Sequence, residues 1–135
     1  MDQARAADAL RRQHFYFFLV AVFKHLHEKE MPDDVYLKAL SFALQSAYQQ
    51  DHGRLLVTIP PRHLKSIAAA VALPAWALGQ NPACKILVAT YGDELSRNHA
   101  SHFASVMRSR WYQSLFPQTK VKTSNQSELR TTKGG

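Results

Sequence analysis

Cysteine and long apolar runs are scarce in this chain, and their scarcity excludes several kinds of protein. The only cysteine among the 135 residues is Cys84, so the chain forms no internal disulfide and no cysteine-based zinc site. The longest apolar run, residues 15–23, has nine residues, whereas a membrane-spanning helix needs about 20. The residues that follow it, Lys24, His25 and His27, do not form a signal-peptide cleavage site, so we expect a buried helix of a cytosolic protein.

Acidic residues are outnumbered by basic ones. The chain has 17 Lys and Arg against 10 Asp and Glu, which gives a formal net charge of +7. This excess favours an anionic partner, which can be nucleic acid, nucleotide phosphates or an acidic surface, and charge alone does not choose among them. Hydrophobic residues make up 46% of the chain, which is ordinary for a folded protein, and the length suits one domain with a core of its own.

Apolar spacing predicts two helices in residues 1–50. The first is expected over residues 4–30, where one apolar stripe runs through Phe15, Phe18, Leu19, Val22 and Leu26. Further apolar side chains cover its other faces, so this helix is expected to be buried or to meet a partner. A break follows, and Asp33 is predicted to cap a second helix that runs to about residue 50.

The pattern of residues 51–135 is typical of an α/β protein. The expected order is a strand over 55–59, a loop over 60–64, a helix from 65 or 66 to 78, a strand over 85–91, a helix over 93–110 and a short strand over 129–132. Pro74 is predicted to kink or divide the connecting helix, and Gly79 is predicted to end it. A strand, a crossover helix and a second strand favour a parallel sheet with right-handed connections.

A phosphate-binding motif is the strongest functional candidate. Lys65 and Ser66 stand at an expected helix start after a buried strand, as at the end of a P-loop. The amides of a helix N-terminus lack intrahelical partners, and the helix dipole adds positive potential there. The Lys65 ammonium can contact β- and γ-phosphate oxygens, and the Ser66 hydroxyl can ligate Mg²⁺. The sequence therefore predicts ATP and Mg²⁺ as cofactors of a partial P-loop NTPase-like parallel sheet flanked by helices (51–135), preceded by the N-terminal helical segment (1–50).

The motif departs from the P-loop pattern in its glycines. The positions six and one residues before the lysine hold Ile59 and Leu64. Pro60 and Pro61 have no N–H to donate, so the amides of residues 62–67 must form any phosphate cradle. A left-handed conformation at Leu64 would cost about 1–2 kcal/mol, and a shorter path that avoids it stays open. The alternative interpretation is a solvated helix start without a ligand.

The residues around this motif resemble a known family. The stretch from Leu55 to Ser66, LLVTIPPRHLKS, is similar to the ATPase loop of terminase large subunits of tailed bacteriophages, which often carry Pro-Pro-Arg-x-x-Lys-Ser in place of a glycine-rich loop. The resemblance covers about residues 50–135 and continues in order through Pro74-Ala75-Trp76, residues 78–82, Ala89-Thr90-Tyr91, Asp93-Glu94-Leu95, Trp111-Tyr112, residues 115–117 and residues 131–135.

The resemblance implies an ATP-driven motor that packages viral DNA into a capsid. In this family Lys65 would bind the phosphates, Ser66 would help to hold Mg²⁺, and Arg62 would sense or stabilise the γ-phosphate as a catalytic group. The predicted nucleotide-binding residues are Pro61, Arg62, His63, Leu64, Lys65, Ser66 and Ile67. The implied partners are double-stranded DNA, the terminase small subunit and the portal, without a membrane, in the cytoplasm of a bacterial host that carries the phage or prophage.

A catalytic acid is not recognisable in the sequence. A P-loop ATPase needs an apolar strand that ends in a carboxylate, and the acidic residues after the loop are Asp93, Glu94 and Glu128. We expect the first two to cap the following helix, whereas Glu128 lies in a polar tail. The carboxylate-rich nuclease of the family is also missing. The chain is therefore interpreted as a truncated terminase product that binds nucleotide weakly and hydrolyses it poorly or not at all.

Two other interpretations stay open, a non-enzymatic basic DNA-binding module and a fragment of another, helicase-like P-loop ATPase. The residues that can contact DNA phosphates, or form a solvated face, are Arg97, Arg108, Arg110, Lys120 and Lys122. His99 and His102 have a spacing that suits metal ligation, but no carboxylate shares their face, so core or interfacial positions are favoured. Adenine contacts are possible for Gln45, Gln49 or Gln50.

Overall fold

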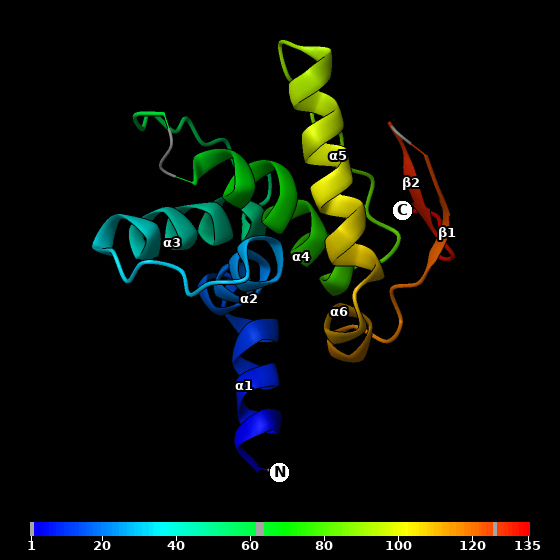
Figure 1. Cartoon of the computed structure of the whole chain (residues 1–135), viewed down its shortest axis with the longest axis horizontal. Helices are drawn as coiled ribbons and strands as arrows, with labels where there is room; N and C mark the ends of the chain where they lie inside the picture. Colours follow the sequence, from blue (N-terminus) through cyan, green and yellow to red (C-terminus); the bar gives the residue numbers. More distant parts are fainter. Residues whose placement is uncertain (1, 62–63, 126) are drawn as a thin grey trace.

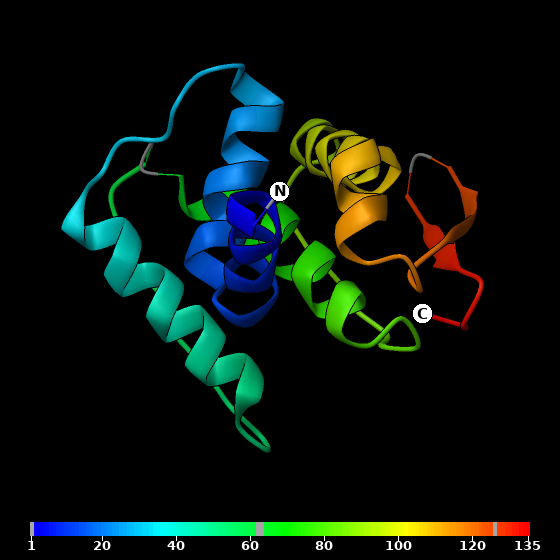
Figure 2. The same cartoon turned by 90° about the horizontal axis from the view of Figure 1, so that it is seen from below.

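The computed structural model describes residues 2–61, 64–125 and 127–135 and is mainly helical (Figure 1). The elements in order are α1 (Asp2–Gln13), α2 (Phe15–His27), α3 (Val35–Gln49), the π-helix η1 (Ile67–Ala72), α4 (Leu73–Gln80), α5 (Asp93–Arg108), α6 (Arg110–Leu115), β1 (Val121–Ser124) and β2 (Leu129–Thr131). Figure 2 shows α3 and the hairpin of β1 and β2 at opposite sides of the molecule, with α2, α4 and α5 between them.

Helix α2 is the centre of the packing. It contacts α1, α3, η1, α4 and α5. Its side chains Phe15, Phe18, Leu19 and Val22 are fully buried, as expected for a helix that is apolar on most of its faces. Residues from both sides of position 50 share one hydrophobic core with them, so the N-terminal helices and the later elements pack as one body.

The prediction of one helix over residues 4–30 is wrong, because the helix is broken at His14, which has an extended backbone. Side chains from other elements take the carbonyl groups at the end of α1. The Trp76 indole donates to the Arg11 carbonyl at 3.0 Å, and the Gln80 amide donates to the Arg12 carbonyl at 2.6 Å. The Gln45 amide donates to the Gln13 carbonyl at 3.0 Å and its oxygen accepts from the Phe15 amide at 2.9 Å. Tertiary hydrogen bonds therefore stabilise a break that helical periodicity does not reveal.

The helix that follows the candidate loop runs from Lys65 to Gln80 and changes type within its length. Its first part is the π-helix η1, where the Leu73 amide bonds to the Ala68 carbonyl five residues back. Pro74 stands in the first turn of α4, where the chain returns to α geometry, so the predicted division falls near this proline. Gly79 does not end the helix. A Cβ there would lie 2.5 Å from the Phe116 ring, so glycine is needed for close packing.

The predicted parallel sheet is not formed, and the α/β fold class is wrong for the described residues. The sheet that they contain has two strands, β1 and β2, which pair antiparallel with Val121 opposite Thr131. Residues 55–59 and 85–91 are extended but pair with no strand. β2 lies within the short strand predicted over residues 129–132.

The exposure of the two extended segments accompanies the missing parallel sheet. Strands buried on both faces were expected, yet Leu56 is 89% exposed and Leu87 is 92% exposed. An extended segment gains strand hydrogen bonds only from a neighbouring strand, and the described residues place none beside either segment. The β propensity of these residues is a local property, so it predicts an extended backbone but not a pairing partner.

The end of the chain is tied to the loop after α4. The Gly135 amide donates to the Pro82 carbonyl at 3.2 Å, and the Thr131 hydroxyl donates to the same carbonyl.

Among the described helices, none has the length and apolar character needed to cross a membrane.

Candidate functional site

The candidate loop lies between the extended segment 54–60 and the helix that begins at Lys65. Its two ends are joined by a side chain, because the Lys65 ammonium donates to the Ile59 carbonyl at 3.4 Å. Leu64 has a φ of 62°, in the left-handed region. This is the position at which the P-loop pattern has glycine, the residue that adopts this conformation without steric cost. The loop therefore takes the more strained of the two paths that the sequence left open.

The helix start behind the loop presents polar groups. The Ala68 amide makes a helical hydrogen bond to the Leu64 carbonyl at 2.9 Å. The amides of residues 65–67 come before it, in the first turn, where helix amides have no acceptor within the helix. Ser66 is exposed, and its side chain makes no capping bond within the described part of the chain. These are the groups that an anion meets at a helix N-terminus.

A hollow of about 470 Å³ adjoins Lys65. It is lined by three groups of residues, from the end of α3 (Leu44, Ala47, Tyr48), from the extended segment (Gly53, Leu55, Val57) and from the loop helix (Lys65, Ala69, Leu73). Apart from Lys65 and the Tyr48 hydroxyl, these side chains are apolar. The lysine is therefore a single cationic group at the wall of an apolar hollow.

The predicted site residues differ in what the structure says of them. Arg62 and His63 lie outside the described residues. Pro61 is exposed and Ile67 is half-buried against the hydrophobic core. Gln45 uses its side chain at the break between α1 and α2, so it is not free to contact a base.

Acidic groups do not gather around the loop. The described residues contain no group of three or more His, Cys, Asp or Glu placed to hold a metal ion. Asp93 and Glu94 lie in the first turn of α5, where carboxylates suit the helix dipole. Glu128 accepts a hydrogen bond from Arg130 at 2.8 Å. Any Mg²⁺ at the loop would thus depend on the Ser66 hydroxyl and on the ligand's own oxygens.

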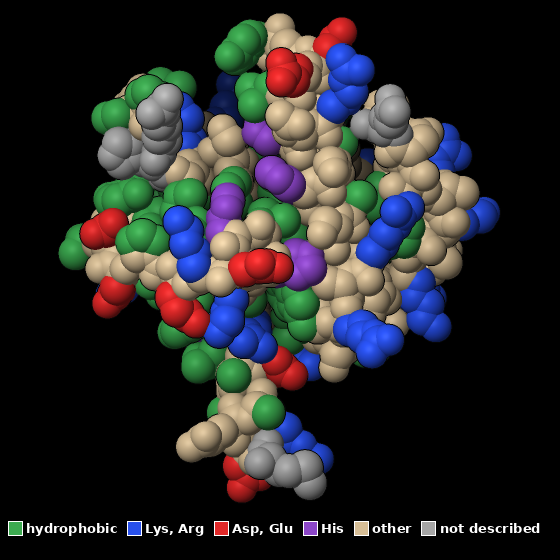
Figure 3. Space-filling model, in the orientation of Figure 1, with side chains coloured by type: hydrophobic (Ala, Val, Ile, Leu, Met, Phe, Trp, Pro, Cys, Tyr) green, Lys and Arg blue, Asp and Glu red, His purple; other side chains and the backbone are tan. Residues whose placement is uncertain are grey.

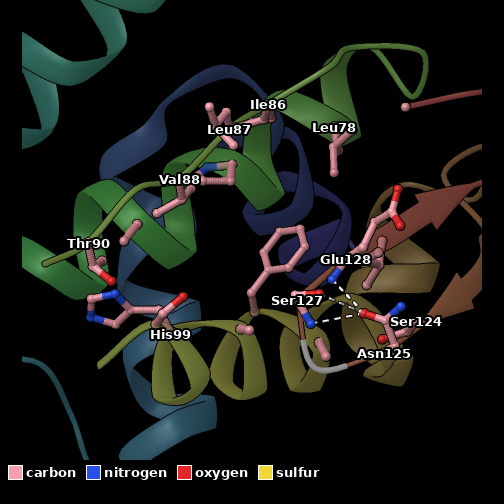
Figure 4. Close-up of a pocket in the computed structure, with 18 of the residues that line it drawn as sticks. Leu78, Ile86, Leu87, Val88, Thr90, His99, Ser124, Asn125, Ser127 and Glu128 are labelled. Atoms are coloured by element: carbon pink, nitrogen blue, oxygen red, sulfur yellow. Dashed lines mark hydrogen bonds between the residues drawn. The ribbon is translucent and has the colours of Figure 1, made fainter. Parts of the chain in front are cut away.

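A second hollow of about 340 Å³, which no sequence motif predicts, lies against α5 (Figure 4). Figure 4 shows the extended chain from Ile86 to Thr90 crossing it, with His99 at one end and Ser124, Asn125, Ser127 and Glu128 at the other. His99 is 9% exposed, and its Nδ1 is buried without a hydrogen-bond partner in the described residues. Burial, and to a smaller extent the neighbouring His102, lowers the pKa of His99.

Positive charge gathers at the C-terminal end of the chain. Between residues 108 and 135 the exposed cations are Arg108, Arg110, Lys120, Lys122, Arg130 and Lys133, and Glu128 is the one acid. This stretch carries six positive charges and one negative, so +5 of the net +7. Figure 3 shows blue side chains over the side of the molecule that Figure 1 assigns to α6 and the hairpin.

Comparison of this chain with protein-family models, with curated proteins and with solved structures finds no match. Function is therefore inferred from the loop, the hollows and the charge distribution.

The left-handed conformation of Leu64 predicts that glycine at this position is more stabilising than alanine, the reverse of the usual order. At a positive φ, Leu64→Gly should unfold with a free energy about 1 kcal/mol higher than Leu64→Ala, because alanine has a Cβ that clashes there. Leu56 is the control, since it is extended and exposed, and there alanine should be the more stable replacement. Urea titration followed by circular dichroism measures both pairs. Alanine above glycine at both positions would contradict the conformation of Leu64.

The burial of His99 predicts loss of stability in mild acid. Its folded-state pKa is lowered from 6.5, so the unfolded state binds the proton more readily. The contribution of His99 to the free energy of unfolding is therefore complete above pH of about 6.5 and is lost as the pH falls below it. Urea midpoints across this range should fall for the wild type and change less for His99→Gln. His102→Gln should keep most of the dependence, because burial is the larger cause.

Proposed function

We propose that residues 59–67 form a phosphate-binding loop for ATP with Mg²⁺. The observation that carries the proposal is the closed loop itself, in which Lys65 reaches back to the Ile59 carbonyl while Leu64 adopts the left-handed conformation of a P-loop glycine. Ile59 and Leu64 stand at the two glycine positions of the motif, six residues and one residue before the lysine. A merely solvated helix start does not require either feature.

The groups at this loop can act on a triphosphate in complementary ways. The Lys65 ammonium makes a long hydrogen bond at 3.4 Å to a neutral carbonyl, and phosphate oxygens are stronger acceptors for a cation. The amides of residues 65–67 and the dipole of a helix of sixteen residues, from 65 to 80, favour the same charge. The exposed Ser66 hydroxyl would ligate Mg²⁺, which supplies charge neutralisation between the phosphates.

Hydrolysis is not expected from this chain by itself. P-loop NTPases hold Mg²⁺ with a second, acidic element, and the acids after the loop lie in the first turn of α5 or pair with Arg130. The activity that these residues support is therefore nucleotide binding. The resemblance of the loop and of the stretches after it to terminase large subunits supports a place in a motor that packages viral DNA, with double-stranded DNA, the small subunit and the portal as partners.

Removal of the lysine tests the loop. Lys65→Ala should weaken binding of ATP with Mg²⁺ by about 10- to 100-fold, the effect of losing one charge-assisted hydrogen bond. Lys85→Ala is the matched control, because it removes the same charge from the other extended segment. Titration calorimetry, with thermal shift as a second readout, measures both variants. Equal affinity of the two variants would contradict a phosphate site at Lys65.

The charge distribution supports a second candidate function, binding of double-stranded DNA by the surface of α6 and the hairpin. This surface has six exposed cations and one acid, so it attracts the phosphates of DNA. Among the described side chains, only Glu128 forms an ion pair with one of these cations. The two candidates are compatible, because the basic surface and the loop belong to different elements.

The second candidate predicts a specific salt dependence. Lys120→Ala with Lys122→Ala should weaken DNA binding for all sequences and lower the slope of log affinity against log salt by about two. Lys24→Ala with Lys38→Ala removes the same net charge from lysines that already pair with Glu30 and Asp33, so this variant should keep the slope. Fluorescence anisotropy with a short duplex measures both. An unchanged slope in the hairpin variant would exclude this surface.

A further inference from the structure

The segment 84–90 follows an extended course (Figure 4), and no strand of the described residues is hydrogen-bonded to it. The Cys84 amide bonds to the Asn81 carbonyl at 3.0 Å, and beyond it the amides and carbonyls of residues 85–89 have no hydrogen-bond partner within the described part of the chain. Such a row of alternating donors and acceptors is matched in full only by another extended strand.

The side chains of this segment alternate in the manner of a strand. Ile86, Leu87 and Val88 all border the hollow against α5, but Ile86 and Val88 are only 41% exposed (Figure 4). Leu87 and Tyr91 are 92% and 98% exposed. Apolar side chains thus occur on both faces, and residues 85–91 contain one charge, that of Lys85. Long apolar edges of this kind are the ones that pair with other chains.

The other extended segment is a poorer edge. Residues 54–60 carry the equally exposed Leu56, and their Leu55 and Val57 line the hollow beside Lys65 much as Ile86 and Val88 line the other hollow. The difference is that this segment ends at Pro60 and Pro61, which have no N–H for a ladder. The two segments therefore differ in the property that strand pairing needs, while they share exposed leucines.

We propose that residues 85–91 pair antiparallel with the same residues of a second copy of this chain. Pairing about Val88 places Ile86 opposite Thr90 and Leu87 opposite Ala89, so apolar side chains meet on both faces. The same register places Lys85 opposite Tyr91, where the ammonium can lie against an aromatic ring. A parallel, in-register pair would instead set Lys85 against Lys85, and like charges directly opposite each other are destabilising. The two-fold arrangement closes on itself and forms a dimer.

The size and charge of the pair set its expected strength. A ladder of seven residues is smaller than a standard interface, which buries about 800 Å² per partner, so we expect dissociation constants in the micromolar range. Each chain carries +7, so the copies repel at low ionic strength. Added salt screens this repulsion, and dimerisation is therefore expected to strengthen with salt, opposite to the binding of a nucleic acid.

Sedimentation velocity of the full chain tests the pairing. The wild type should form dimers at high micromolar concentration, with a larger dimer fraction at high salt than at low salt. Leu87→Lys places two further charges in the ladder and should abolish the dimer. Leu56→Lys adds the same charge at an equally exposed leucine of the other segment and should leave the dimer intact. A wild type that is monomeric under all these conditions, or an equal loss in both variants, would overturn the proposal.

A cross-link tests the register without depending on affinity. In a Cys84→Ser background, Val88→Cys brings its thiol to the two-fold axis, where opposite Cβ atoms are about 4.5–5.5 Å apart. Mild oxidation should give a disulfide-linked dimer from this variant and far less from Leu87→Cys, whose opposite residue is Ala89. Folding of each variant is checked by circular dichroism. Equal cross-linking at positions 87 and 88 would overturn the antiparallel register.

Discussion

The enclosure of α2 is the constraint on which the rest of the structure depends. This helix is apolar on most of its faces, so water must be kept from nearly its whole circumference. α1, α3, η1, α4 and α5 all contact it. The candidate phosphate loop begins the helix that contains η1 and α4, so its position is fixed by packing against α2. The candidate loop is thus held by a core centred on the N-terminal half of the chain.

The predictable part of the fold was the part decided by local spacing. The helices of residues 35–49 and 93–108 follow from apolar periodicity, because helical hydrogen bonds stay within the segment. The break at His14 was not predictable, since Gln45, Trp76 and Gln80 stabilise it from distant positions. The parallel sheet was predicted wrongly for a related reason. Strand propensity is local, whereas a strand's hydrogen bonds come from a neighbour, and none lies beside residues 55–59 or 85–91.

The candidate site also has features that the sequence identifies and features that only the folded chain reveals. Its lysine, its hydroxyl and the possibility of a left-handed Leu64 could be named from motif spacing, because the chemistry of a helix start is local. The contact from Lys65 to Ile59 and the hollow beside it required the folded chain. The hollow at His99 had no sequence signal, because its walls come from η1, α4, α5, both strands and the segment 84–90, which are far apart in the sequence.

The π-helix η1 has a mechanical consequence for the loop in front of it. Its turns hold more residues than α turns, so the helix between Lys65 and Pro74 is underwound. Tightening these six residues to α geometry would rotate Lys65 about the helix axis by about a third of a turn relative to α4, which Gly79 and Phe116 keep in place. A change in the winding of η1 would therefore move the Lys65 ammonium group, which lies at the N-terminal end of this helix.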